Sequence, residues 1–133
     1  NYHMENSILK GKKILIVEDD LPSRLYLNKI LEKTGAVLIN AGDGSEAVRI
    51  AGENPDIVLI LMDIQLPVLN GYAAATKIKQ SEHKSKIIAQ TAFSLTDDLE
   101  KIRSSDFDDY IIKPIYPDQL IEKISTIVAE ANL

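Results

Sequence analysis

The 133-residue chain has the length of one globular domain, with 45% hydrophobic and 26% charged residues. Its net charge of −5 argues against a broad basic surface for nucleic acid or anionic membrane, and its lack of cysteine excludes disulfides and thiolate metal sites. The longest apolar run, Ile57 to Met62, is far shorter than the ~20 residues that span a bilayer, and residues 1–13 are too polar for a signal peptide. We therefore expect a cytoplasmic protein that neither inserts into a membrane nor binds nucleic acid directly.

The chain opens with a polar lead-in, residues 1–11, which we expect to be a tail or linker before a folded domain at 12–130. The first apolar run, Lys13–Val17, is rich in β-branched residues and predicts a buried strand. An amphipathic helix is predicted next at Leu21–Thr34, because its apolar residues recur at helical spacing, and Gly35 is expected to end it.

A second strand and helix follow, and then the most apolar segment of the chain. Val37–Ile39 predicts a short strand, and Asp43 and Glu46 have the spacing of a capping box that opens a helix through Ala51. Ile57–Met62 is apolar throughout, which is typical of a central strand covered on both faces.

The same alternation continues after a turn at Leu66–Pro67. The pattern predicts, in order, a helix at 71–80, a strand at 86–90, a helix at 96–104, a strand at 110–112 and a helix from Pro117 onward. Five strands that alternate with five helices indicate an α/β fold in which a parallel sheet is covered on both faces. We therefore predict a doubly wound α/β sandwich.

Residues capable of phosphoryl chemistry follow four of the five predicted strands. In a doubly wound sheet, ligands bind beyond the carboxyl ends of the strands, so these residues would share one edge. They are Glu18-Asp19-Asp20, Asp63, Thr91 and Lys113. Any one of them alone would be an ordinary strand terminus, but together they predict a single site assembled by the fold.

Charge balance predicts what this site would bind. Glu18, Asp19 and Asp63 would place about three negative charges close together, which requires a cation or protonation. A set of oxygen donors favours Mg²⁺ over Zn²⁺. With the ammonium of Lys113, the metal would nearly neutralise the carboxylates, so that Asp63 could act as a nucleophile toward a phosphoryl group while the Thr91 hydroxyl donates to one of its oxygens.

Several of these residues also have a structural interpretation. Asp20 is interpreted as the N-cap of the first helix, next to a functional Asp19. Thr91 by itself could be a β-branched strand residue, and Tyr110 could serve only in packing. His83 lies in a polar loop, so we interpret it as a surface residue rather than a phosphotransfer histidine.

The sequence around these positions resembles the response-regulator receiver family over almost all of residues 12–128. The matching stretches are Ile14–Asp20, Leu61–Pro67, Asn70–Tyr72, Ile88–Ala92 and Asp108–Pro114. The resemblance implies a flavodoxin-like fold, with five parallel strands in the order 2-1-3-4-5 and five helices.

The resemblance also implies residue roles. Asp63 would be the phosphoacceptor, and Lys113 would contact the phosphoryl oxygens. The protein ligands of Mg²⁺ would be Asp19, Asp63, the backbone carbonyl of Gln65 and, through water, Glu18. Mn²⁺ could substitute for Mg²⁺.

Further positions would control switching and phosphate lifetime. Thr91 and Tyr110 resemble the switch pair of the family, in which the hydroxyl moves toward the phosphate and the ring turns inward behind it. Gln65 and Phe93 occupy positions that tune water access. The peptide bond before Pro114 is expected to be cis.

Three positions depart from the pattern of the family. Asp106 stands where a glycine usually ends the helix before the fifth strand, and a left-handed backbone there would cost more with Asp than with Gly. Gln90 stands where an apolar residue is common, and Leu66–Pro67 replaces the commoner Met-Pro.

The expected function is that of a phosphoacceptor receiver domain in a two-component phosphorelay. It would accept a phosphoryl group from a phosphohistidine and then switch its signalling surface. Its partners would be a histidine kinase, a histidine phosphotransfer protein or both, and it would be a monomer or a weak phosphorylation-dependent dimer. We expect no conventional enzyme, only magnesium-dependent autophosphorylation and slow autodephosphorylation.

Two other functions were weighed against this one. An aspartyl phosphatase or phosphotransferase typically carries a second acid two residues after its nucleophile, where this chain has Gln65. A pseudo-receiver that serves only as a docking surface would not need Asp63, Thr91 and Lys113. The lead-in, and Ile115 after Lys113–Pro114, resemble the corresponding segments of receivers attached to hybrid histidine kinases.

Overall fold

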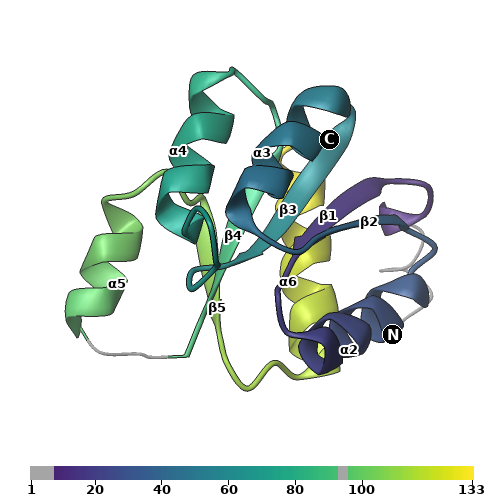
Figure 1. Cartoon of the computed structure of the whole chain (residues 1–133). Helices are drawn as coiled ribbons and strands as arrows, with labels where there is room; N and C mark the ends of the chain where they lie inside the picture. The colour runs from purple at the N-terminus through teal and green to yellow at the C-terminus, as the bar shows by residue number, and fades with distance from the viewer. Residues whose placement is uncertain (1–7, 93–95) are drawn as a thin grey trace.

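The computed structural model describes residues 8–92 and 96–133, and Figure 1 shows how their elements are arranged. The strands are β1 (Lys13–Val17), β2 (Val37–Ala41), β3 (Ile57–Asp63), β4 (Lys86–Thr91) and β5 (Asp109–Ile112). The helices are α2 (Leu21–Glu32), α3 (Gly44–Glu53), α4 (Gly71–Gln80), α5 (Thr96–Arg103) and α6 (Pro117–Glu130). Strands and helices therefore alternate along the chain as the periodicity predicts.

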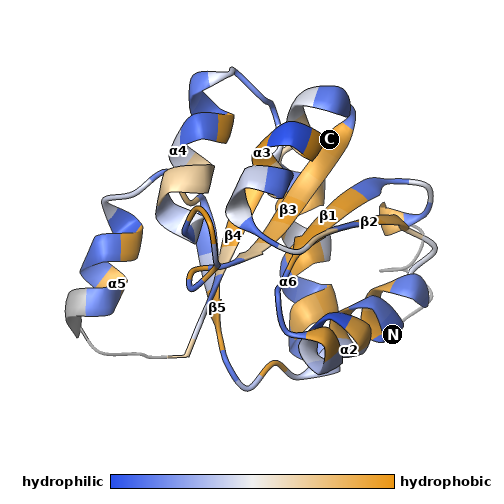
Figure 2. Cartoon of the chain, viewed as in Figure 1, coloured by the Kyte–Doolittle hydropathy of each residue, from blue (hydrophilic) through white to orange (hydrophobic). Residues whose placement is uncertain are grey.

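The five strands form one sheet in the order β2-β1-β3-β4-β5, and every neighbouring pair is parallel. One hydrophobic cluster packs α3, α4 and α5 on one face of the sheet, and a second packs α2 and α6 on the other. Colouring by hydropathy shows apolar strands in the middle and polar outer faces on the helices (Figure 2). The predicted doubly wound fold and strand order are confirmed.

Strand β3 occupies the centre of the sheet because it can be covered on both sides. Every residue of β3 except the half-buried Val58 is buried, and the strand pairs with both β1 and β4. Burial of a Leu or Ile side chain stabilises a fold by about 1.5–3 kcal/mol. This apolar strand therefore anchors Asp63, its last residue, at the carboxyl edge of the sheet.

The lead-in contributes to the core. Leu9 is fully buried and packs in the cluster that joins α2 and α6 to the sheet. The N–H of Gly11 donates to the carbonyl of Gly35 over 2.9 Å, which ties the lead-in to the end of α2. Gly35 has φ +79°, a conformation suited to glycine, and the helix ends at Glu32, two residues before the predicted limit.

Side-chain caps begin the three helices that follow β1, β2 and β3. Asp20 accepts from the N–H of Ser23 over 3.0 Å, which confirms the predicted N-cap. Asp43 likewise accepts from the N–H of Glu46 over 2.7 Å, while the Glu46 carboxylate accepts from the N–H of Gly42. Asn70 caps α4. Such caps contribute about 1 kcal/mol each and set where each loop leaves the sheet edge.

Two loop residues behave differently from the sequence-based expectation. Asp106 is not among the described residues with a left-handed backbone; its carboxylate instead accepts from the hydroxyl of Thr76 over 2.8 Å. The strain expected from replacing a glycine is therefore absent at Asp106. His83 is half-buried, with Nδ1 accepting from the N–H of Ser85 and Nε2 3.1 Å from the carbonyl oxygen of Asn54, so its ring joins two loops.

Within the described residues, no helix is both long enough and apolar enough to cross a membrane.

Candidate functional site

The side chains that the sequence predicts to form a site meet at the carboxyl edge of the sheet. Carboxylate oxygens of Glu18, Asp19 and Asp63 all lie within 4.8 Å of one another, although 45 residues separate the first from the last. Lys113, which follows β5, reaches the same point from the other side. The parallel topology explains this convergence, because β1, β3 and β5 all end at this edge.

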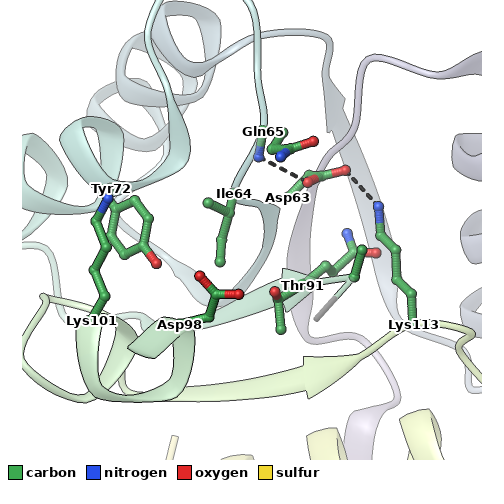
Figure 3. Close-up of a pocket in the computed structure, with 10 residues that line it drawn as sticks. Asp63, Ile64, Gln65, Tyr72, Thr91, Asp98, Lys101 and Lys113 are labelled. Atoms are coloured by element: carbon green, nitrogen blue, oxygen red, sulfur yellow. Dashed lines mark hydrogen bonds and ion pairs between the residues drawn. The ribbon is translucent and has the colours of Figure 1, made fainter. Parts of the chain in front are cut away.

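Asp63 is held by a donor on each of its oxygens. The Lys113 Nζ donates to Oδ2 over 2.8 Å, and the backbone N–H of Gln65 donates to Oδ1 over 3.0 Å (Figure 3). Only 7% of the residue is exposed. Its carboxylate is therefore oriented in advance of any ligand, with its outer side facing a cavity.

The position of Lys113 is set by the backbone around it. Its N–H donates to the carbonyl of Thr91 over 2.8 Å, which continues the pairing of β4 with β5. The Lys113–Pro114 peptide bond is cis, as the resemblance implies. The backbone pairing fixes Lys113 at the end of β4.

Glu18 is the most buried acid of the cluster, with 1% of its surface exposed. Its burial, together with the nearby charge of Asp63, raises the pKa of Glu18 to about 7 from an ordinary 4.5, against the lowering effect of the Asp20 N–H that donates to its Oε2. Its other oxygen, Oε1, has no hydrogen-bond partner within residues 8–92 and 96–133.

This donor set fits a hard divalent cation. Three carboxylates lie within reach of one ion, one of them with an unpartnered buried oxygen, and the described residues of the cluster include neither histidine nor cysteine. Oxygen donors of this kind suit Mg²⁺.

A cavity of about 200 Å³ opens beside Asp63. Thr91 and Gln65 line it as the sequence predicts, and Lys113 closes one side. Three further lining residues, Tyr72, Asp98 and Lys101, come from α4 and α5 and face the cavity opposite Lys113 (Figure 3). Sequence reasoning missed them, since nothing in a helical pattern shows which polar position faces a distant strand end.

The proposed switch residues lie in different surroundings. Thr91 is buried at the cavity, with 7% of its surface exposed. Tyr110 is half-buried on β5 and does not line the cavity; Lys123 Nζ lies 5.6 Å from its ring centroid and donates to its carbonyl. Phe93 lies outside the described residues.

Comparison with known proteins decides the family. Residues 14–125 match the model of the response regulator receiver domain. The chain belongs to this family. The match spans β1 to α6 and therefore includes every residue of the acidic cluster and the lysine opposite it.

Individual receivers resemble the chain over most of its length. It is 37% identical over 123 residues to the polar-differentiation response regulator DivK of Brucella ovis, covering 90% of this chain and 98% of that protein. The receiver domain of a sensor histidine kinase from Pseudomonas aeruginosa, with a magnesium ion coordinated in its active-site cleft, has a TM-score of 0.79 and 34% identity over 88% of this chain and 96% of its own.

A third match comes from a complex. The co-crystal structure of the Saccharomyces cerevisiae histidine phosphotransfer signaling protein Ypd1 with the receiver domain of Ssk1 has a TM-score of 0.82, 33% identity and 88% coverage of both chains. Among the curated relatives, the chain spans 17% or less of a sensor kinase, a hybrid signal transduction histidine kinase and a probable histidine kinase. This receiver domain thus corresponds to a complete protein in some relatives and to a small part of a longer one in others.

Proposed function

We propose that this receiver domain accepts a phosphoryl group from a phosphohistidine on Asp63. The observation that carries the proposal is the environment of one carboxylate: Asp63 lies against the Lys113 ammonium on one side and against Glu18 and Asp19 on the other. A carboxylate so placed is oriented for attack and lies beside groups that can offset the incoming charge.

The acidic residues would hold a metal ion. Asp19, Asp63 and the backbone carbonyl of Gln65 would bind Mg²⁺, with Glu18 acting through water, and Mn²⁺ could take the same place. The ion would supply positive charge beside the phosphoryl oxygens. The three carboxylates fit this role because their oxygens converge within 4.8 Å.

The chain itself would position the reacting groups. A carboxylate oxygen of Asp63 attacks phosphorus, an acyl phosphate bond forms, and the bond from phosphorus to the imidazole nitrogen of the donor breaks. Lys113 moves its contact from the carboxylate to the new phosphoryl oxygens. The Thr91 hydroxyl, already at the cavity, donates to one of them.

Switching and dephosphorylation follow from the same arrangement. Movement of Thr91 toward the phosphate would leave room for Tyr110 to turn inward from its half-buried position on β5. Gln65 lines the cavity, where it would control access of water to the acyl phosphate, and we assign the same role to Phe93. An amide at Gln65 supplies no general acid, so we propose slow autodephosphorylation rather than enzymatic turnover.

The decisive experiment is phosphorylation by a small donor. Incubation with acetyl phosphate and Mg²⁺ should add the mass of one phosphoryl group, detected by intact mass spectrometry. Asp63→Asn should remain unlabelled, and Asp56→Asn, which alters an exposed acid paired with Lys13, should be labelled as the wild type is. A wild-type protein without any added mass would refute the proposal.

We further propose that the phosphoryl donor or acceptor is a histidine kinase or a histidine phosphotransfer protein in the cytoplasm, and that the chain functions as a monomer or a weak phosphorylation-dependent dimer. An exposed apolar surface beside the site supports such a partner. It consists of Leu21, Leu25 and Tyr26 on α2 and Tyr116 after β5, each 47–60% exposed. Exposed apolar groups gathered at one place are typical of protein contact surfaces.

A charge placed on this surface should separate partner transfer from intrinsic chemistry. Leu25→Glu should slow transfer from a phosphorylated phosphotransfer protein at least about tenfold, because burial of one apolar side chain in an interface is worth 1.4 kcal/mol or more. Labelling by acetyl phosphate should stay unchanged. The matched control is Val37→Glu, which charges an exposed apolar residue at the opposite edge of the sheet and should leave both rates intact. Equal slowing in the two variants would contradict a partner surface on α2.

A further inference from the structure

Gln90 is a buried polar residue whose presence the proposed chemistry does not explain. It lies in β4 directly before Thr91, and only 1% of its surface is exposed. Its side-chain Nε2 has no hydrogen-bond partner in the described part of the chain. A buried donor without an acceptor lowers stability by about 1–3 kcal/mol, so the amide of Gln90 requires a hydrogen-bond acceptor.

The residue borders two cavities. One is the cavity beside Asp63. The other, of about 180 Å³, lies between α2 and the segment after β5, and its apolar walls include Leu27, Pro114 and Ile115. Gln90, Lys113 and Glu18 supply polar groups to this second cavity. Gln90 therefore lines both the cavity beside Asp63 and the cavity beside Glu18.

Glu18 offers the matching half of a hydrogen bond. Its Oε1 is buried and has no hydrogen-bond partner among the residues that the structure describes, and Glu18 lines the same second cavity. Neighbouring Asp63 is a carboxylate too, which when ionised has no proton to donate. An ionised Glu18 thus needs a neutral or cationic donor, and the amide of Gln90 is a neutral one.

The hydroxyl donors around this cavity are already engaged, and the ammonium of Lys113 is directed at Asp63. The hydroxyl of Ser23 donates to Asp20 over 2.6 Å, and the hydroxyl of Tyr26 donates to the carbonyl of Ile115 over 2.8 Å. The Lys113 ammonium lies 2.8 Å from Asp63 Oδ2. Gln90 Nε2 and Glu18 Oε1 are thus a complementary neutral donor and acceptor on two residues that line one cavity.

We propose that Gln90 is a positioning residue for the metal site: when the acidic cluster holds its ion, the amide of Gln90 donates to Glu18 and orients that carboxylate toward Asp19 and Asp63. Both residues line the second cavity, so their side chains lie on the same side of the sheet edge. Groups that orient metal ligands in this way commonly determine affinity. The inference rests on the proposed function, because it assigns Gln90 a role in the magnesium site of the same cluster.

The test compares magnesium affinity in a double-mutant cycle, measured by isothermal titration calorimetry. Gln90→Met preserves the length of the side chain and removes the donor, so Mg²⁺ should bind about tenfold more weakly. In a Glu18→Gln background the same exchange should cause no further loss, because the group on which Gln90 acts has lost its charge. Ser125→Ala is the matched control: it removes another buried oxygen without a partner, on α6 and outside both cavities, and should leave the affinity unchanged.

Two outcomes would overturn the inference: wild-type affinity in Gln90→Met, or an equal loss in both backgrounds. A measurement on the unaltered side chain provides an independent check should the Met variant unfold. In ¹⁵N-labelled protein, the NMR chemical shift of the Gln90 side-chain amide should change on addition of Mg²⁺, and it should not change in Glu18→Gln. An unchanged chemical shift in the wild type would also overturn the role. If only the role of Gln90 is wrong, acetyl phosphate still labels Asp63 in the wild-type protein. If the proposed function is wrong, the wild-type protein is not labelled.

Discussion

At the scale of the residue, the acidic cluster opposes folding in the absence of a cation. Glu18 is almost fully buried, and its burial raises its pKa to about 7, since water no longer solvates the charge and Asp63 repels it. Protonation of Glu18 removes its charge and therefore relieves this unfavourable contribution to folding. The pKa of Asp20, an exposed neighbour, is lowered by the Ser23 hydrogen bonds that form the helix cap. Glu18 and Asp20, which both follow β1, thus differ because one is buried and the other caps a helix.

The pKa of Glu18 predicts a pH dependence of stability. Its value in the folded state, about 7, lies above the ordinary 4.5, so the folded state binds the proton more tightly than the unfolded chain does. The stability this group contributes is present below pH 4.5 and is lost as the pH rises to 7. Glu18→Gln should therefore be close to wild type at pH 4.5 and more stable at pH 7.5 by over about 1 kcal/mol, in EDTA. Urea unfolding at the two pH values measures this, and a difference independent of pH would contradict the assignment.

At the scale of the element, the loop from β3 to α4 depends on one close backbone approach. A Cβ at Gly71 would lie 2.5 Å from the carbonyl oxygen of Asp63 and 2.8 Å from the Cα of Ile64, closer than real contacts allow. The N–H of Gly71 also donates to the carbonyl of Ile64 over 2.8 Å. The first turn of α4 is therefore pressed against the strand end that carries the phosphoacceptor, and only a residue without a side chain permits this.

Replacement of Gly71 should damage both stability and the site. Gly71→Ala should lower the free energy of unfolding by about 2 kcal/mol or more, because backbone atoms must move to admit the methyl group. Labelling of Asp63 should slow as well. Gly52→Ala is the matched control: a Cβ there meets nothing within 4 Å, so alanine in α3 should be neutral or stabilise by about 0.5–1 kcal/mol. Urea unfolding of both variants tests this, and two equal effects would show that the close approach is unimportant.

At the scale of the whole molecule, the cluster links metal binding to stability. The protein carries a net charge of −5, and three of its acids converge at one edge of the sheet. A cation that binds only the folded state stabilises it in proportion to its occupancy. The same convergence that costs stability in the free protein therefore becomes favourable once the charge is offset.

Magnesium should consequently raise the melting temperature. At about 100 times its Kd, Mg²⁺ should stabilise the fold by about 2.7 kcal/mol, which for a domain of this size is a rise of roughly 5–10 °C. Asp19→Asn should remove most of that rise while changing the melting temperature in EDTA little, since Asp19 is exposed. Glu122→Gln, an exposed acid on α6, should keep the full rise. Differential scanning calorimetry decides, and an undiminished rise in Asp19→Asn would exclude that residue from the site.

Much of this protein was predictable from local pattern alone. The period of apolar residues determined the five strands and the helices between them, since burial on one face or both leaves a periodic trace in the chain. Polar residues at strand ends then identified Glu18, Asp19, Asp63 and Lys113, because parallel strands must end at one edge. The resemblance to a family added the strand order and the cis bond before Pro114.

Only the tertiary structure decided which side chains share a cavity. Gln90 and Glu18 line one cavity although 72 residues separate them, and neither belongs to a pattern that could relate them. Leu9, expected in a tail, fills a gap in the core beside α2 and α6. Periodicity records whether a residue is buried but not against what it is buried, because the partner across a cavity depends on packing between elements that are distant in sequence.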